Sequence, residues 1–148
     1  VMSLRDGLKK MSKSDPSDLS RINMSDDADS IAQKFRKAKT DPDALPSDEA
    51  GLENRPEARN LVAIYAALED QSLDEVLNDI GGKQFSEFKP MLIDRAVATL
   101  SPISAEMNRL MQEPDEIDRV LANGAERARQ IAQPILNQTY DIMGLLRS

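Results

Sequence analysis

The sequence contains neither histidine nor cysteine among its 148 residues. Their absence excludes disulfides, a thiolate nucleophile, an imidazole general base and the usual zinc ligands, so we assign no metal-binding residues. Aromatic residues make up only 3% of the chain, whereas 40% of the residues are apolar. The predicted core must therefore be built mainly from aliphatic side chains and alanine.

Long apolar runs are also missing, and no stretch approaches the roughly 20 residues that a membrane-spanning helix needs. The first residues mix basic and acidic side chains and lack the pattern of a signal peptide. We therefore predict a cytoplasmic protein with no membrane partner. A length of 148 residues suffices for one domain with its own core and is too short for two of ordinary size.

Charge is distributed unevenly along the chain. The net charge is −7, but residues 1–40 carry a balance of +3 and residues 41–148 a balance of −10. A net negative charge is unfavourable for a free-standing nucleic-acid binder, so any RNA contact in the acidic part needs a local basic face. Positive charge gathers instead in the first 40 residues, which also contain the most informative motif.

Residues 10–14 read Lys-Met-Ser-Lys-Ser. Lysine carries a compact charge on a flexible stem, so Lys10 and Lys13 are suited to hold a polyphosphate. The serines add hydroxyl donors, and an exposed loop supplies backbone N–H groups for phosphate oxygens. Such groups can stabilise the charge that develops on a departing pyrophosphate. A lone Lys-x-x-Lys pair is usually solvated surface, so the interpretation depends on the unbroken five-residue match and its flanks.

The five residues are the KMSKS signature of class I aminoacyl-tRNA synthetases, and their flanks resemble the bacterial tryptophanyl-tRNA synthetase family. The resemblance is carried by residues 1–4 before the motif and by residues 15–18, 20–24 and 26–28 after it. Later stretches at residues 31–34, 37–41 and 124–128 also look like that family. The resemblance therefore extends over essentially the whole chain.

The resemblance implies the chemistry of a tryptophan–tRNA ligase. ATP and tryptophan would form tryptophanyl-adenylate with release of pyrophosphate, and the tryptophanyl group would then pass to the 3′ end of tRNA(Trp). Lys10 and Lys13 would be catalytic, with Lys13 as the first choice for the direct phosphate contact. Val1 would touch adenine through its backbone, and Mg²⁺ would accompany ATP without an all-protein cage. The implied nucleotide-binding set is Val1, Lys10, Met11, Ser12, Lys13 and Ser14.

Class I synthetases also resemble one another in a first signature, His-x-Gly-His or a close variant, on a Rossmann domain. A chain without histidine cannot contain that signature. We therefore expect the chain to be the C-terminal portion of a longer enzyme, whose tryptophan pocket lies upstream. The resemblance implies that the full-length enzyme is a homodimer, and we expect the 148 residues alone to be inactive.

The predicted fold is mainly α. A bundle of about five helices, resembling the family's anticodon-binding domain, follows a short strand-loop remnant of a Rossmann domain. We place the domain boundary between residues 1–24 and residues 25–148. Val1–Leu4 is predicted to form a strand, and Arg5–Ser20, rich in Gly, Pro, Ser and Asp, is predicted to form a loop.

Capping residues and prolines predict where the first three helices begin. Ser25 is the predicted N-cap of the first helix, Pro56 the first residue of the second, and Ser72 with Glu75 the capping box of the third. Lys34, Arg36, Lys37 and Lys39 form a basic cluster that we interpret mainly as charge complementing the end of the first helix. Contact with an RNA backbone is the alternative role for this cluster.

Two longer helical patterns follow. The first spans Gln84–Gln112, and we expect a break or kink before Pro90 and before Pro102. The second spans Pro114 to about Met143, with Gly144 as its stop. Pro134 is expected to kink this second helix, and its small residues Gly124, Ala125 and Ala128 would permit a close helix crossing.

Two other functions stay open. The chain can come from a tyrosyl- or other class I synthetase, since the tryptophan interpretation depends on the flanks of the motif and not on the motif itself. It can also be a non-enzymatic helical interaction module, a free-standing relative that has lost catalysis. A strand, Gly/His signature and helix in the upstream coding sequence would favour the enzyme over the module.

Overall fold

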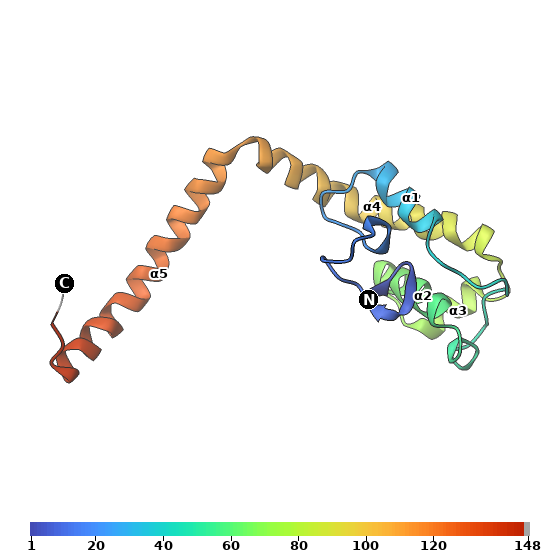
Figure 1. The fold of residues 1–148 in the computed structure, drawn as a ribbon, viewed down its shortest axis with the longest axis horizontal. Helices are drawn as coiled ribbons and strands as arrows, with labels where there is room; N and C mark the ends of the chain where they lie inside the picture. Colours follow the sequence, from blue (N-terminus) through green and yellow to red (C-terminus); the bar gives the residue numbers. More distant parts are fainter. Residues whose placement is uncertain (147–148) are drawn as a thin grey trace. The chain divides into compact units, whose positions relative to one another are not determined.

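The computed structural model describes residues 1–146, which form five α-helices and one small sheet of two strands (Figure 1). The mainly α fold predicted from the sequence is therefore confirmed. The elements are β1 (Met2–Ser3), β2 (Asp6–Lys10), α1 (Ala28–Arg36), α2 (Pro56–Glu69), α3 (Leu73–Ile80), α4 (Phe85–Gln112) and α5 (Pro114–Met143). Single 3₁₀ turns lie at Asp18–Ser20 and Ala50–Leu52.

The chain divides into two compact units, residues 1–107 and residues 108–148, of which the second is described as far as residue 146. The first unit contains the sheet, α1, α2, α3 and most of α4. The second contains the end of α4 and all of α5. The domain boundary after residue 24 stays a prediction.

The strands β1 and β2 form an antiparallel hairpin in which Met2 pairs with Lys10 and Ser3 with Asp6. The loop predicted for Arg5–Ser20 was therefore wrong over β2. Two contacts with α2 explain why a strand forms there. Gly7 lies so close to α2 that an added Cβ would be 2.4 Å from the carbonyl carbon of Pro56. Asn60, buried in α2, accepts from the N–H of Met2 at 2.9 Å and donates to its carbonyl at 3.0 Å.

The N-cap of α1 is Asp27, so the prediction of Ser25 was wrong by two residues. The Asp27 carboxylate accepts from the backbone N–H of Ser30 at 2.8 Å. Hydrogen bonds from the hydroxyl and the backbone N–H of Ser30 hold the pKa of Asp27 below its ordinary value. Aspartate and serine are both good N-caps, and the pattern of apolar residues alone does not choose between neighbouring candidates.

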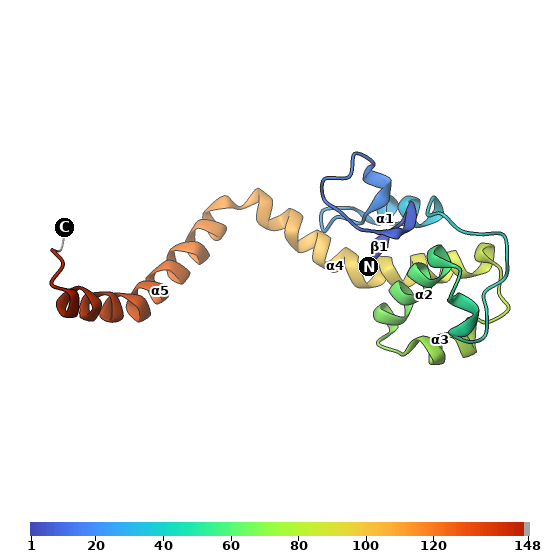
Figure 2. The same cartoon turned by 60° about the horizontal axis from the view of Figure 1, so that its bottom comes forward.

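The starts of α2 and α3 agree with the prediction. Pro56 is the first residue of α2, where its missing N–H costs no hydrogen bond. In the capping box of α3, Ser72 accepts from the N–H of Glu75 at 3.3 Å, and Glu75 accepts from the N–H of Ser72 at 2.9 Å. Figure 2 shows α2 and α3 next to each other, in agreement with their contacts.

The helix α4 continues through both of its prolines, so a break is not found at either, whereas a kink before each stays a prediction. Pro90 and Pro102 are exposed, as are Ser86 and Ala98, the residues four positions before them. The carbonyls that the prolines leave without a helical donor therefore lie on faces where water can replace that donor. The helix α5 likewise continues through Pro134, and it ends before Gly144, whose φ of 64° fits the predicted stop.

The core lies entirely in residues 1–107 and draws on α1, α2, α3 and α4. As predicted, it is mainly aliphatic, and the three phenylalanines of the chain are all buried in it. The largest fully buried side chains include Phe35, Phe88, Leu4, Ile31, Leu52, Leu61, Leu77, Ile80 and Leu92. In contrast, α5 contributes no buried residue.

Candidate functional site

The signature at residues 10–14 begins on a strand and continues into a turn. Lys10 is the last residue of β2, whereas Met11–Ser14 lie in the loop that the sequence predicted. The hydroxyl oxygens of Ser12 and Ser14 are 3.0 Å apart, and the N–H of Ser14 donates to the hydroxyl of Ser12 at 3.3 Å. These local bonds shape the turn, and leave its lysines at the surface.

Lys10 and Lys13 are both exposed, and neither has an ion pair with any residue between 1 and 146. Their neighbour Lys9, by contrast, pairs with Asp6 at 3.4 Å. An ammonium without a carboxylate partner can bind a ligand anion without first losing an internal contact. The arrangement is therefore suited to phosphate, the ligand that the sequence predicted.

The structure brings Val1 to the start of the signature. The carbonyl of Val1 accepts from the N–H of Met11 at 3.4 Å, so two members of the predicted nucleotide-binding set lie side by side. Val1 also lines a cavity of about 440 Å³ between the hairpin and α2. The predicted adenine contact of Val1 stays a prediction.

A larger cavity, of about 640 Å³, opens beside the signature loop. Its volume is within the range of small-molecule sites. The signature contributes three residues to its wall, and the segment after the 3₁₀ turn at Asp18–Ser20 contributes five. The lining residues are Met11, Ser12, Lys13, Arg21, Ile22, Asn23, Met24, Ser25 and Met107. Of the predicted site residues, Met11, Ser12 and Lys13 therefore share one cavity, whereas Val1 borders the other.

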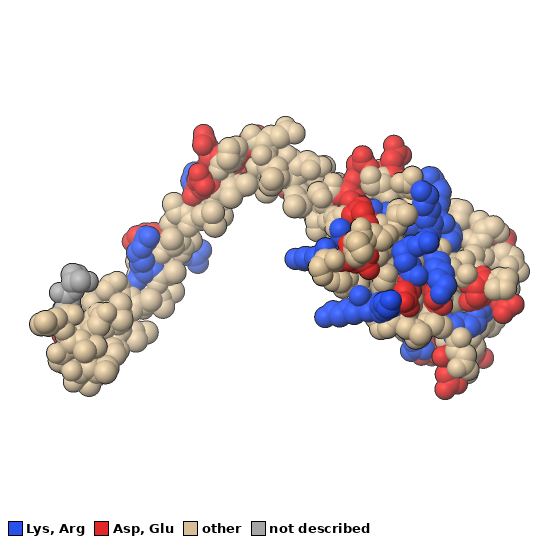
Figure 3. All heavy atoms as spheres, in the orientation of Figure 1, with Lys and Arg blue, Asp and Glu red and all other residues tan. Residues whose placement is uncertain are grey.

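Lys and Arg side chains gather on one face of the unit formed by residues 1–107 (Figure 3). Cations also hold the end of α1. Lys89 donates to the carbonyls of Arg36 at 3.0 Å and Ala38 at 2.7 Å, and Arg5 donates to the carbonyl of Lys37. Burial and the nearby charge of Arg5 lower the pKa of Lys89. Lys89, which lies in α4, thus adds a positive charge to those of the first 40 residues.

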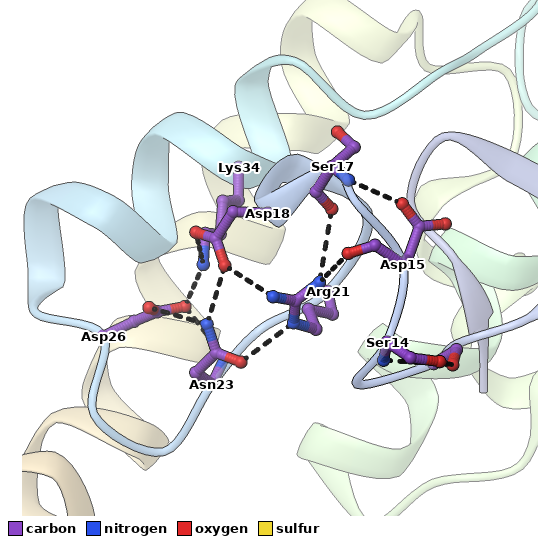
Figure 4. A network of polar contacts seen from close by, with 9 residues as sticks. Ser14, Asp15, Ser17, Asp18, Arg21, Asn23, Asp26 and Lys34 are labelled. Atoms are coloured by element: carbon purple, nitrogen blue, oxygen red, sulfur yellow. Dashed lines mark hydrogen bonds and ion pairs between the residues drawn. The ribbon is translucent and has the colours of Figure 1, made fainter.

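A network of polar contacts joins the segment after the signature to α1 (Figure 4). At its centre Lys34, only 4% exposed, forms ion pairs with Asp18 at 2.7 Å and with Asp26 at 2.5 Å. Arg21 pairs with Asp18 at 3.2 Å and donates to the carbonyl of Asp15 at 2.9 Å. The network therefore reaches the residue that directly follows the signature.

The electrostatics of this network favour its charged form. The hydrogen bond from Lys34 is the main cause that lowers the pKa of Asp18. Burial pulls the pKa of Lys34 down, but hydrogen bonds to Asp18 and Asp26 outweigh it and raise the pKa above its ordinary value. Both shifts keep the lysine and the aspartate charged at neutral pH.

Sequence reasoning missed this network because it interpreted Lys34 as charge at the end of a helix. A signal was present in the helical spacing. Lys34 is three residues after Ile31 and one before Phe35, both buried, so it belongs to the face of α1 that packs inward. A lysine on an apolar face needs an acidic partner, and Asp18 and Asp26 supply it.

No group of three or more acidic side chains is arranged to hold a metal ion within residues 1–146. Across the same residues, every helix is either too short or too polar to cross a membrane.

Comparison with known proteins gives a consistent result across the chain. Residues 1–101 match the family model described as tRNA synthetases class I (W and Y). The tryptophan–tRNA ligase of Rhizobium meliloti is 63% identical over 147 residues, and that of Agrobacterium fabrum is 60% identical over 147 residues. Each match covers 99% of this chain and 42% of the relative, so the chain spans less than half the length of the curated relatives it matches.

A solved structure supports the same relationship. The crystal structure of tryptophanyl-tRNA synthetase from Mycoplasma pneumoniae matches with a TM-score of 0.72 and 25% sequence identity. The match covers 99% of this chain and 46% of that protein. The fold, the signature and the family model agree, and the chain belongs to the class I tRNA synthetase family that contains the W and Y enzymes.

Proposed function

We propose that this chain is the C-terminal part of a tryptophan–tRNA ligase, in which it supplies the lysines that bind the phosphates of ATP. The observation that carries the proposal is the pair of exposed cations in the signature, Lys10 and Lys13, neither of which forms an ion pair within residues 1–146. The names of its similar relatives support tryptophan as the amino acid. The share of 42% that the chain covers in those relatives supports a longer enzyme.

In the proposed first step, a carboxylate oxygen of tryptophan attacks the α-phosphorus of ATP. An O–P bond forms, the bond from the α-phosphorus to the bridging oxygen breaks, and pyrophosphate leaves with that electron pair. Lys13 contacts the departing phosphates, and Lys10 holds them from the end of β2. Ser12 and Ser14 donate to phosphate oxygens. The charge on the pyrophosphate is thus stabilised where it develops.

The second step would transfer the tryptophanyl group to the 3′ end of tRNA(Trp). We propose that residues 25–148 form the helical domain that binds the tRNA anticodon, and that the full-length enzyme is a cytoplasmic homodimer. The residues between 1 and 146 offer no cluster of carboxylates for Mg²⁺. We propose that Mg²⁺ accompanies ATP and is held mainly by phosphate and water, as this small ion prefers.

A tyrosyl enzyme is the second candidate, because the matching family model covers both the W and the Y enzymes. The names of the relatives favour tryptophan over tyrosine. Pyrophosphate exchange with each amino acid in the full-length enzyme discriminates between them. We expect exchange with tryptophan, and none above background with the 148-residue chain alone.

The role of Lys13 is tested by Lys13→Ala in the full-length ligase. We expect adenylate formation to slow by about 10²–10³, the usual cost of losing one preorganised contact to developing charge. Tryptophan binding should change little, and so should the melting temperature, since Lys13 is exposed. Lys13→Arg should recover only part of the rate, because a planar guanidinium does not replace a compact ammonium.

The matched control is Lys9→Ala, which removes an exposed lysine from the same hairpin, already paired with Asp6. It should leave the rate unchanged. Single-turnover adenylate formation measured by rapid quench decides the outcome. An unchanged rate constant in Lys13→Ala, or a loss of rate that follows a large drop in melting temperature, would reduce Lys13 to ordinary surface charge.

A further inference from the structure

We propose that Arg21 and Lys34 are positioning residues that hold the signature loop in its productive place. This proposal relies on the proposed function and adds to it a second set of residues that acts through the loop carrying Lys13. Its basis is the chain of contacts in Figure 4, which runs from the core helix α1 to the backbone directly after the signature.

The first link is the contact between Arg21 and the loop. The Arg21 guanidinium donates to the carbonyl of Asp15 at 2.9 Å and to the carbonyl of Ser17 at 3.4 Å. These carbonyls lie one and three residues after Ser14, the last residue of the signature. Both bonds come from the same terminal nitrogen, so the planar group keeps its Nε and its other terminal nitrogen for contacts that orient it, which a lysine has no further nitrogens to make.

The second link holds Arg21 itself. Its Nε donates to the side-chain oxygen of Asn23 at 3.2 Å, and its other terminal nitrogen pairs with Asp18 at 3.2 Å. Asn23 in turn donates to Asp18 at 3.0 Å, and its backbone N–H donates to Asp26 at 2.8 Å. The orientation of the guanidinium is therefore set by two side chains and not by solvent.

The third link connects this cluster to the core. Lys34 binds both Asp18 and Asp26 and is buried in α1, between residues that pack into the hydrophobic core. A buried charge that loses its partners is strongly unfavourable, so Lys34 keeps the two aspartates in place. Asp18 then keeps Arg21 in place, and Arg21 keeps the loop in place.

The other end of the loop is held independently. Met2 pairs with Lys10 in the hairpin, and the N–H of Met11 donates to the carbonyl of Val1. The turn that carries Lys13 is thus anchored upstream by the sheet and downstream by Arg21. Misplacement of a catalytic group by about 1 Å can cost roughly 10²-fold in rate, so the downstream anchor affects the reaction through the position of Lys13.

The test is a double-mutant cycle in the full-length ligase between Arg21→Ala and Lys13→Ala. We expect Arg21→Ala alone to slow single-turnover adenylate formation by roughly 10- to 100-fold, while the affinity for tryptophan is kept. Because Arg21 acts through the loop that carries Lys13, we expect Arg21→Ala to cause less than a threefold further loss in the Lys13→Ala background. Such non-additivity identifies residues that act as a unit, and general structural damage does not produce it.

Arg95→Ala is the matched control, since Arg95 also donates to a backbone carbonyl, that of Leu68, and pairs with a carboxylate, that of Glu69. It should leave the rate unchanged. Lys34→Met should slow the reaction in the same way as Arg21→Ala and should also be non-additive with Lys13→Ala. If Arg21→Ala or Lys34→Met lowers the melting temperature by several degrees, the cycle is repeated with Arg21→Lys in place of that variant. We expect Arg21→Lys to lose less rate than Arg21→Ala.

The outcomes separate the two proposals. Loss of rate in Lys13→Ala together with a normal rate in Arg21→Ala and Arg21→Lys would overturn the positioning role and leave the proposed function intact. Additive losses in the cycle would also overturn it. A normal rate in Lys13→Ala would instead overturn the proposed role of the signature, whatever Arg21→Ala does.

Discussion

The two long helices of the chain differ in burial although they look alike in sequence. α4 has 28 residues and α5 has 30, and each contains proline and an apolar stripe at helical spacing. α4 buries Phe85, Phe88, Leu92, Ile93, Ala96 and Ser104, whereas α5 buries no residue. On α5 the apolar side chains stay exposed, among them Val120, Leu121, Ile131, Ile135, Leu136 and Ile142.

This difference shows that helical spacing and burial are separate properties, although one periodic pattern of apolar residues suggests both. Helical spacing is a local feature of one segment, but burial depends on which other segment covers the apolar face. An isolated helix is marginal in water, and apolar surface contributes roughly 25 cal/mol per Å² only when it leaves water. Within this chain α4 therefore supports the fold, whereas the apolar face of α5 adds no burial.

The largest expected effect is the loss of Phe88 from α4. Phe88 is 0% exposed and forms edge-to-face contacts with Tyr65, at 5.5 Å between ring centroids, and with Phe85, at 6.4 Å. Phe88→Ala should lower the free energy of unfolding of the 148-residue chain by about 3–5 kcal/mol, through lost burial and the cavity left behind. Urea unfolding followed by circular dichroism measures it.

The matched change in α5 is Ile131→Ala, at a side chain that is 72% exposed. It should alter the free energy of unfolding by no more than about 0.5 kcal/mol, as for other surface positions. Similar losses for Phe88→Ala and Ile131→Ala would show that α5 is as well packed as α4, and the contrast between the helices would be wrong.

The sequence predicted features that depend on a few neighbouring residues. Pro56, the capping box of Ser72 and Glu75, and the stop at Gly144 all act within one helical turn, so single-sequence reasoning finds them. The signature was recognised because its five residues are contiguous.

Features that depend on distant segments were missed. β2 forms because Gly7 fits against α2, about 50 residues later in the chain, and the sequence around Gly7 does not predict that contact. The partners of Lys34 lie up to 16 residues away, across the loop that follows the signature. The sequence did not decide between a break and a kink at Pro90 and Pro102, because the cost of each proline depends on whether the freed carbonyl faces water, which is a property of the folded chain.

An intermediate effect is expected at Gly7, in the well-packed unit. An added Cβ would be 2.4 Å from the carbonyl carbon of Pro56 and 2.6 Å from the backbone nitrogen of Glu57. Backbone cannot move aside as a side chain does, so Gly7→Ala should cost about 1–3 kcal/mol, the usual cost of overpacking. The unfolding midpoint in urea measures this cost, and an unchanged midpoint would mean that β2 does not lie against α2 in solution.

A small effect of opposite sign, a gain in stability, is expected for the same substitution at Gly124 in α5. Apart from its chain neighbours and the backbone of its own helix, no atom of the described residues lies within 4 Å of an added Cβ there, so the methyl group meets no obstacle. Glycine inside a helix is less favourable than alanine by roughly 0.5–1 kcal/mol, because it loses more backbone freedom on folding. Gly124→Ala should therefore stabilise α5 by that amount, seen as slower amide hydrogen exchange along the helix.

Gly144→Ala is the matched control at the end of the same helix, where φ is 64° and alanine is strained. It should accelerate exchange in the last turn. Faster exchange in Gly124→Ala would instead mean that a helix packs closely against Gly124, the crossing that the small residues of this segment predicted, and α5 would then share the packed character of α4.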